Sequence, residues 1–285
     1  MTPLLPAGVD QALLDALRVV ALDAATEAGE LLLGGRPAVR ATTLDVGTKS
    51  SPTDVVTAMD RAAEDLLVDR LLGARPDDGL LGEEGSAREG TSGLRWVIDP
   101  LDGTVNYLYG LPQWGVAVLA EHTATGTPLV GVVVVPVLGE TYVAVAGRGA
   151  TRLDAHGEQV MRVSTCDDLA MALIGTGFGY RAERRAAQAR VVAAMLPRVR
   201  DIRRGGAAAV DLCHVASGSL DGYYERGLQP WDLGAGGLVA LEAGALLAGA
   251  GGGPPGEDLV VAAGPGIFGA LRDAVLALRA DTDEV

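Results

Sequence analysis

The stretch LVGVVVVPVLGETYVAV, residues 129–145, limits the fold of this chain more than any other segment. Valine dominates both of its halves, and β-branched side chains favour extended strands over helices. The pair Leu138-Gly139 interrupts the run with a residue type that is common in turns. The stretch therefore predicts a hairpin with strands over 129–135 and 140–146.

Helical and extended patterns alternate irregularly around this hairpin. Apolar residues at helical spacing predict a helix over 9–33, ending at Gly34-Gly35, and a second helix over 53–72. In the second helix, Leu67 and Leu71 are expected to face inward. The acids and the arginine of that helix are expected to face solvent, namely Asp60, Arg61, Glu64 and Asp65.

The rest of the chain mixes short strands and helices. Further strands are predicted over 79–83, 95–99, 114–121, 160–164, 169–174, 221–224 and 258–262. Further helices are predicted over 181–197, 206–217, 232–244 and 266–280. This mixed order indicates an α+β or layered α/β architecture rather than a regular βαβ wind.

Charge and cysteine usage limit the classes of partner. A net charge of −14 argues against nucleic acid or an anionic membrane as the main partner. A small phosphorylated substrate remains compatible, because bound divalent cations reverse the local charge. Cys166 and Cys213 are far apart and form no Cys-x-x-Cys motif, which favours a reducing cytosol. The N-terminus lacks a basic segment, so it does not predict a signal peptide. The weakly apolar run 233–253 is mostly glycine and alanine, so it does not predict a membrane span.

Two acids close an apolar strand in the sequence WVIDPLDGTVNY, residues 96–107. Pro100 keeps Asp99 extended, and Gly103 allows the backbone to come close to a ligand. Asp99 and Asp102 can then point to one place, where two carboxylates repel each other unless one keeps a proton or a cation joins them. Mg²⁺, which prefers oxygen ligands, suits such a turn. A turn held by bonds from the acids to the backbone is the alternative.

Three other stretches place acids beside turns or helix starts. Glu83 and Glu84 lie between glycines in LLGEEGS, although paired glutamates are common on solvated surfaces. Asp232 opens a predicted helix in QPWDLGAGG, as an ordinary N-cap does. Asp54 begins the predicted second helix in TKSSPTD, where capping is again the alternative. Alone, none of the three distinguishes a ligand from ordinary local structure.

Together, these stretches resemble the inositol monophosphatase family of magnesium-dependent, lithium-sensitive phosphatases. WVIDPLDGTVNY is similar to the first family signature, Asp-Pro-(Ile/Leu)-Asp-Gly-Thr-x-Asn-(Phe/Tyr), and WDLGAGGLVALEAGA is similar to the second. GEEG and KSSPTDVVTAMD fall where the family has them, and IRRGGAAAVDLCHVASGSLDGYYERG resembles its substrate-side segment. The resemblance extends over residues 10–280.

The resemblance implies an α/β fold, the layered αβαβα sandwich of this family. It implies one domain over 1–285, in two subdomains over 1–147 and 148–285 with a metal cleft between them. It also implies a homodimer whose substrate is a small phosphorylated polyol, and the two separate cysteines favour a cytoplasmic location.

The resemblance implies a site with two or three Mg²⁺ ions. The implied metal ligands are Glu83, Asp99, the backbone carbonyl of Leu101, Asp102 and Asp232. Asp54 and Thr104 are expected to orient and deprotonate the attacking water, with Asp54 accepting a hydrogen bond from Thr104. The implied contacts to the substrate come from Gly103, Thr104, Gly206, Ala208 and Glu225. One departure is Ala207, where the family often has threonine.

The implied function is hydrolysis of inositol monophosphate to inositol and phosphate. The same chemistry on fructose 1,6-bisphosphate, histidinol phosphate or a 3′-phosphoadenosine nucleotide is the first alternative. Arg203 and Arg204 could add charge for a second phosphate, or they are surface arginines. The segment YYERG with Glu225 favours the inositol type. A regulatory binding protein that keeps the fold is the alternative from another class.

Overall fold

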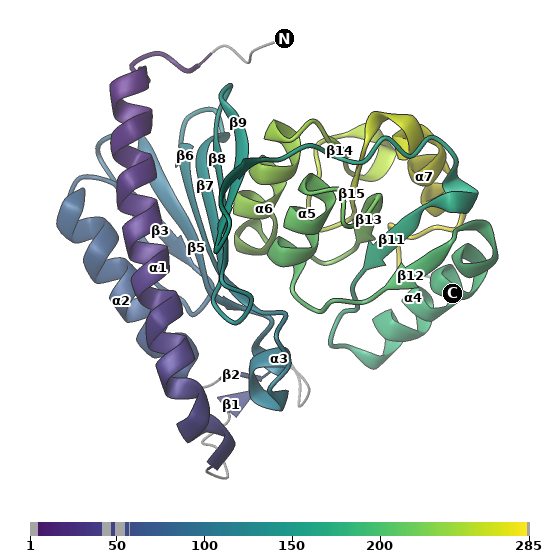
Figure 1. Ribbon diagram of the computed structural model, residues 1–285, viewed down its shortest axis with the longest axis horizontal. Coiled ribbons are helices and arrows are strands. Elements are labelled where there is room, and N and C mark those ends of the chain that lie inside the picture. The colour runs from purple at the N-terminus through teal and green to yellow at the C-terminus, as the bar shows by residue number, and fades with distance from the viewer. Residues whose placement is uncertain (1–4, 42–46, 49–54, 57, 284–285) are drawn as a thin grey trace.

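The computed structural model describes residues 5–41, 47–48, 55–56 and 58–283. Its helices and sheets alternate in five layers, as Figure 1 shows. Two N-terminal helices cover one face of a large sheet, and two helices pack between this sheet and a smaller one. Two further helices cover the outer face of the smaller sheet. The layered αβαβα architecture expected from the sequence is therefore confirmed.

The helical layers come from separate parts of the chain. The first outer layer contains α1 (Gln11–Ala41) and α2 (Ala58–Ala74). The middle layer contains α5 (Ala208–Ala216) and α6 (Pro230–Glu242). The second outer layer contains α4 (Ala182–Met195) and α7 (Pro265–Ala277). A short helix, α3 (Thr104–Tyr109), lies at one end of the large sheet.

The large sheet has eight strands in the order β10-β9-β8-β7-β6-β5-β3-β4. Its strands are β3 (Gly79–Gly82), β4 (Ala87–Arg88), β5 (Leu94–Asp102), β6 (Gly115–His122), β7 (Thr127–Val135), β8 (Glu140–Val145), β9 (Gly149–Asp154) and β10 (Gly157–Val160). All neighbours are antiparallel except β3 and β5. The predicted hairpin is confirmed, since Val135 pairs with Glu140 across the turn. The sheet continues through Val160, past the subdomain boundary expected at 147.

The smaller sheet has five strands in the order β12-β11-β13-β15-β14. These strands are β11 (Leu173–Thr176), β12 (Asp201–Arg203), β13 (Gly222–Glu225), β14 (Leu246–Ala248) and β15 (Val260–Ala263). Two short strands, β1 (Gly47–Thr48) and β2 (Val55–Val56), form a separate antiparallel pair.

The valine run of β7 is buried on both faces of the large sheet. Val132 and Val134 belong to the core under α1 and α2, whereas Val133 and Val135 belong to the core that contains α5 and α6. Successive side chains of a strand point to opposite faces, so a strand covered on both sides needs an unbroken apolar sequence. Burial on both faces therefore explains why the valine run of β7 is apolar at every position.

Several expectations from the sequence are wrong in detail. Helix α1 does not end at Gly34-Gly35 but continues to Ala41. Asp60 and Glu64 of α2 do not face solvent, since their exposed fractions are 1% and 2%. No strand covers 161–164, because β10 ends at Val160. Helix α3 and strands β4, β9, β12 and β14 were not expected, and neither was β2, which takes Val55–Val56 from the helix predicted over 53–72. Among the described helices, none combines the length and hydropathy needed to cross a bilayer.

Candidate active site

A cleft of about 410 Å³ collects the predicted site residues from both halves of the chain. The large-sheet side supplies Glu83, Asp99, Leu101, Asp102, Gly103 and Thr104, and the small-sheet side supplies Gly206, Ala208, Glu225 and Asp232. Asp54, the remaining predicted residue, lies outside the described residues. The structure thus gathers in one place acids that are up to 149 positions apart in sequence (83 to 232).

An irregularity at the end of β5 presents the two acids of the IDPLDGT stretch. Asp99 pairs with Ala117 and Asp102 pairs with Gly115, so the register of β5 shifts between the two acids. The Asp99 carboxylate accepts a hydrogen bond of 2.9 Å from the Leu101 N–H. Gly103 then turns the chain with φ +88°, where a side chain would be strained and crowded by the carbonyl oxygen of Gln113.

Four buried or half-buried carboxyls face one another in this cleft. The pKa of Asp99 is raised well above its usual value, first by burial and then by the negative charges of Glu83, Asp102 and Asp232. Burial and the charge of Glu83 likewise raise the pKa of Asp232. A proton or a cation among these groups would relieve the repulsion.

The donor set fits a hard divalent cation. Carboxylate oxygens are the ligands that Mg²⁺ prefers, and a cation would compensate the negative charges that raise the pKa of Asp99. In the described residues no three His, Cys, Asp or Glu side chains meet closely enough to form a complete metal site by themselves. Asp99 and Asp232 each accept a local hydrogen bond, Asp232 from the Gln229 N–H at 2.7 Å, and each carboxylate keeps further lone pairs for a cation.

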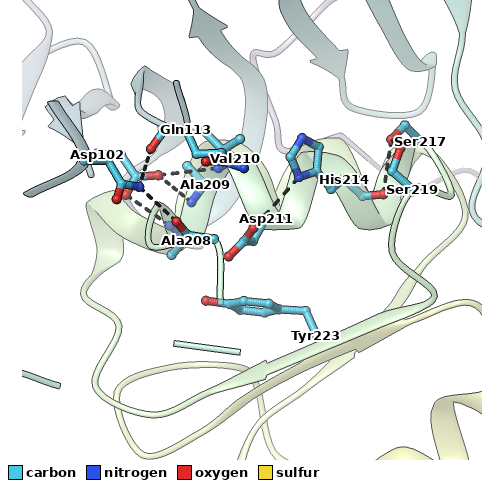
Figure 2. A network of polar contacts seen from close by, with 12 residues as sticks. Asp102, Gln113, Ala208, Ala209, Val210, Asp211, His214, Ser217, Ser219 and Tyr223 are labelled. Carbon is cyan, nitrogen blue, oxygen red and sulfur yellow. Dashed lines mark hydrogen bonds and ion pairs between the residues drawn. The ribbon is translucent and has the colours of Figure 1, made fainter. Parts of the chain in front are cut away.

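Asp102 caps the middle-layer helix α5 from across the cleft, as Figure 2 shows. Its carboxylate accepts the N–H groups of Ala208 at 3.1 Å, Ala209 at 2.8 Å and Val210 at 3.4 Å. Ala207, the residue that precedes the helix, makes no capping bond of its own. These three amides oppose the effect of burial on Asp102, and its pKa is raised only to about 7. One carboxylate thus joins the two halves of the cleft.

Asp60 is a site residue that the sequence did not reveal. The Thr104 hydroxyl donates a hydrogen bond of 2.9 Å to the Asp60 carboxylate, and both residues are buried. Asp54 was the partner expected for Thr104. The signal that could have found Asp60 is its position on the same helical face as Leu67 and Leu71, seven and eleven residues further along.

Glu64, one helical turn after Asp60, holds the turn that carries Glu83. Its two carboxylate oxygens accept the N–H groups of Glu84 at 2.8 Å and Ser86 at 2.9 Å. Gly82 lets this carboxylate come close, because a Cβ there would lie 2.6 Å from one of its oxygens. Helix α2 therefore contacts the cleft residues at two places, through Asp60 to Thr104 and through Glu64 to the turn that carries Glu83.

Glu225 lies on the opposite wall of the cleft, and Asp211 is buried behind it on α5. Burial raises the pKa of Glu225 to about 7, while a hydrogen bond from Tyr223 and the charge of Arg204 act in the opposite direction. Gly177 lies directly against the Glu225 carboxylate and leaves no room for a side chain. Asp211 on α5 has a pKa raised to about 8, mainly by burial and by the charge of Asp102. Figure 2 places Asp211 between His214 and Tyr223.

Known proteins match this chain over most of its length. The family model described as "Inositol monophosphatase family" matches residues 13–281. The inositol-1-monophosphatase of Mycobacterium leprae is 48% identical over 272 residues, which cover 91% of this chain and 93% of that protein. The Nus factor SuhB of Pasteurella multocida is 38% identical over 230 residues, which cover 80% and 83%. The solved structure of Mycobacterium tuberculosis SuhB matches with a TM-score of 0.80 at 41% identity, covering 94% of this chain and 98% of that one.

Proposed function

Because this chain belongs to the inositol monophosphatase family, we propose that it is a Mg²⁺-dependent phosphatase that hydrolyses inositol monophosphate to inositol and phosphate. The observation that supports this most directly is the meeting of Glu83, Asp99, Asp102 and Asp232 in one cleft with the Thr104 hydroxyl. Phosphoryl transfer to water depends mainly on positioning and on neutralising charge, and the cleft has groups suited to both.

Five groups would hold Mg²⁺ in this proposal. They are the carboxylates of Glu83, Asp99, Asp102 and Asp232 and the backbone carbonyl of Leu101. When bound, Mg²⁺ would lower the pKa of water and neutralise charge on the phosphate oxygens. The raised pKa of Asp99 supports this assignment, because burial and the charges of Glu83, Asp102 and Asp232 leave its carboxylate without a compensating positive charge. Two or three ions per site remain part of the proposal.

Thr104 and Asp60 would orient and deprotonate the attacking water. A carboxylate can only accept, so the Thr104 hydroxyl donates to Asp60 and keeps its lone pairs for a water in the cleft. As the water loses a proton to the Thr104 oxygen, the hydroxyl proton can pass to Asp60. Asp60 enters the proposal beside Asp54, whose expected role stays a prediction because Asp54 lies outside the described residues.

The remaining cleft residues would bind the two ends of the substrate. Gly103 and Thr104 stand at the start of α3, where N–H groups point out of the helix towards a phosphate. Gly206 and Glu225 line the wall where the polyol would lie. Ala208 donates its N–H to Asp102 and therefore shapes this wall without offering that donor to a hydroxyl.

An assay of phosphate release from inositol 1-phosphate tests the proposal. We expect release with Mg²⁺, none with EDTA, and a strong loss in Asp99→Asn, whereas exposed Asp69→Asn should behave as wild type. Activity that survives EDTA would contradict the metal mechanism. Faster turnover of fructose 1,6-bisphosphate, histidinol phosphate or a 3′-phosphoadenosine nucleotide would support the first alternative. Absence of any release would favour a binding role, such as the name of the Pasteurella multocida relative suggests for that protein.

Lithium inhibition, a homodimer and a cytoplasmic location belong to the same proposal. The first two are implied by the resemblance, and the cytoplasmic location is supported by the two separate cysteines, which are both free. A lithium titration of the assay and light scattering after size-exclusion chromatography would test inhibition and oligomeric state.

A further inference from the structure

Two loops form the wall of the cleft that carries Glu225. The first joins β11 to α4 over residues 177–181, and the second joins β13 to α6 over residues 226–229. The loops leave neighbouring parallel strands, since Thr176 pairs with Tyr224 just before them. In the described part of the chain, no backbone–backbone hydrogen bond joins the loops beyond that pairing. Side-chain contacts therefore hold the two loops together beyond the sheet.

Arg184 lies between these two loops. It belongs to the first turn of α4, and a Cβ on Gly179 of the first loop would lie 2.6 Å from its Cδ atom. A Cβ on Gly227 of the second loop would lie 2.5 Å from its Nη1 atom. The arginine side chain thus fills the space that a side chain at either glycine would take. One residue therefore contacts both loops.

A single carboxylate, that of Asp283 in the segment after α7, lies beside Arg184 and Arg226. The Arg184 Nε atom lies 3.3 Å from it, and Arg226 forms an ion pair with it. The side chains of Arg184 and Arg226 are only 20% and 16% exposed, and partly buried charges are screened less by salt than exposed ones. Among the described residues, no other carboxylate forms an ion pair with either arginine. Asp283 therefore keeps two positive charges beside each other.

The Asp283 carboxylate also lies close to the functional part of the wall. Gly177, Glu225, Arg226 and Asp283 share the lining of one small cavity, so the segment after α7 lies directly behind Glu225. Arg226 follows Glu225 in the sequence, and the Glu225 carboxylate lies directly against Gly177 of the first loop. Without the charge of Asp283, the two guanidinium groups would repel each other. A displacement of Arg226 would then move Glu225 as well.

We propose that Asp283 is a positioning residue that holds Arg184 and Arg226 together and thereby fixes both loops around Glu225. The described lining of the cleft does not include Asp283, so this residue acts only through the two arginines. Its effect is expected on the alcohol part of the substrate, because Glu225 lines the wall where the polyol would lie. For that effect the inference rests on the proposed phosphatase function, whereas the bracing of the loops does not depend on it.

Hydrogen exchange tests the bracing of the loops without any substrate. The Gly179 N–H donates to a side chain of α4 at 2.9 Å, and the Gly227 N–H donates to a backbone carbonyl at 2.7 Å, so each amide reports the opening of one loop. In Asp283→Asn, both amides should exchange about 10-fold faster than in wild type. Asp281→Asn removes the same charge two positions earlier and should exchange as wild type does. Wild-type exchange in Asp283→Asn would overturn the inference.

Two substrates separate positioning from a general loss of structure. Inositol 1-phosphate presents hydroxyls to the wall that carries Glu225, whereas 4-nitrophenyl phosphate has none. In Asp283→Asn, the ratio of kcat/KM for inositol 1-phosphate to kcat/KM for 4-nitrophenyl phosphate should fall about 10-fold, mainly through a higher KM for inositol 1-phosphate. Asp283→Glu keeps the charge and should recover most of the ratio. Asp281→Asn should keep the wild-type ratio.

These measurements distinguish failure of the inference from failure of the proposed function. An unchanged ratio in Asp283→Asn, or equal losses for both substrates, would overturn the inference while the proposed function stands. If wild type does not hydrolyse inositol 1-phosphate, the proposed function fails instead. Hydrogen exchange at Gly179 and Gly227 then decides alone, because faster exchange in Asp283→Asn but not in Asp281→Asn supports the bracing of the loops, and wild-type exchange in both refutes it.

Discussion

The hydroxyl of Thr104 donates to the buried carboxylate of Asp60 across 2.9 Å, which joins the start of α3 to the start of α2. Four residues after Asp60, Glu64 accepts two N–H groups from the turn that presents Glu83. Residues four apart lie on one face of a helix, so one face of α2 contacts both the Thr104 hydroxyl and the turn that carries Glu83. A rotation of α2 would disturb both at once.

Asp60→Asn should lower kcat about 100-fold to 10,000-fold, the usual contribution of a positioned proton acceptor. The amide oxygen can still accept the Thr104 hydrogen bond of 2.9 Å, so KM should change little, but an amide does not take up the proton. Steady-state kinetics with inositol 1-phosphate measure this split, with exposed Asp69→Asn as the control. Wild-type kcat in Asp60→Asn would remove this residue from the proposed mechanism.

Glu64→Gln should weaken Mg²⁺ binding about 10-fold to 100-fold, as changes behind metal ligands commonly do. The glutamine NH₂ group cannot accept the N–H of Glu84 or Ser86, so one amide of the turn loses its partner. Because the metal ligands remain, kcat at saturating Mg²⁺ should recover most of its wild-type value. Calorimetric titration with Mg²⁺ measures the affinity directly, and Asp65→Asn, exposed on the same helix, is the control. Unchanged affinity would mean that the turn holds its shape without Glu64.

The sequence was sufficient for the layered architecture and for the acids that meet in the cleft. Val132–Val135 alternate between two buried faces, and such a strand is recognisable from its composition alone. Asp99 and Asp102 were recognisable because proline and glycine fix the turn between them and the strand before it ends there.

The contacts that α2 makes with the cleft could not be predicted from the sequence in this way. Asp60 and Glu64 are charged, so their helical spacing alone favoured a solvated face. Only the approach of Thr104, 44 residues away, and of the turn at Glu84, 20 residues away, makes their burial favourable. Helix α1 continues beyond its expected end at Gly34-Gly35 because a contact with a distant part of the chain again outweighs the local sequence signal. A glycine inside a helix costs only about 1 kcal/mol of stability. After the two glycines, the Arg36 side chain donates a hydrogen bond of 3.0 Å to the Leu111 carbonyl.

Asp211 should make the wild-type protein less stable as the pH rises. Its pKa is about 8 in the folded protein, raised from 3.8 mainly by burial, so between these values the folded state holds a proton that the unfolded chain releases. Stability from this group is therefore complete below about pH 4 and is lost as the pH rises to about 8. Asp211→Asn should match wild type at about pH 4 and melt about 2–6 °C higher at pH 8. Thermal melts in EDTA across this range measure the difference, and a difference that does not vary with pH would contradict the assignment.

Asp99→Asn should separate stability from function. Burial and then the negative charges of Glu83, Asp102 and Asp232 raise the pKa of Asp99 well above its usual value in the metal-free protein. Asparagine removes the charge and can still accept the Leu101 N–H that now lies at 2.9 Å. The metal-free variant should therefore melt higher than metal-free wild type at pH 8, because a buried charge without a partner is costly.

Mg²⁺ at about 100 times its Kd should stabilise wild type by about 2.7 kcal/mol and the variant by much less. The two proteins should thus exchange their order of melting temperature when Mg²⁺ replaces EDTA. Equal stabilisation of both by Mg²⁺ would show that Asp99 is not a ligand, and a lower metal-free melting temperature in the variant would show that its charge is compensated within the protein.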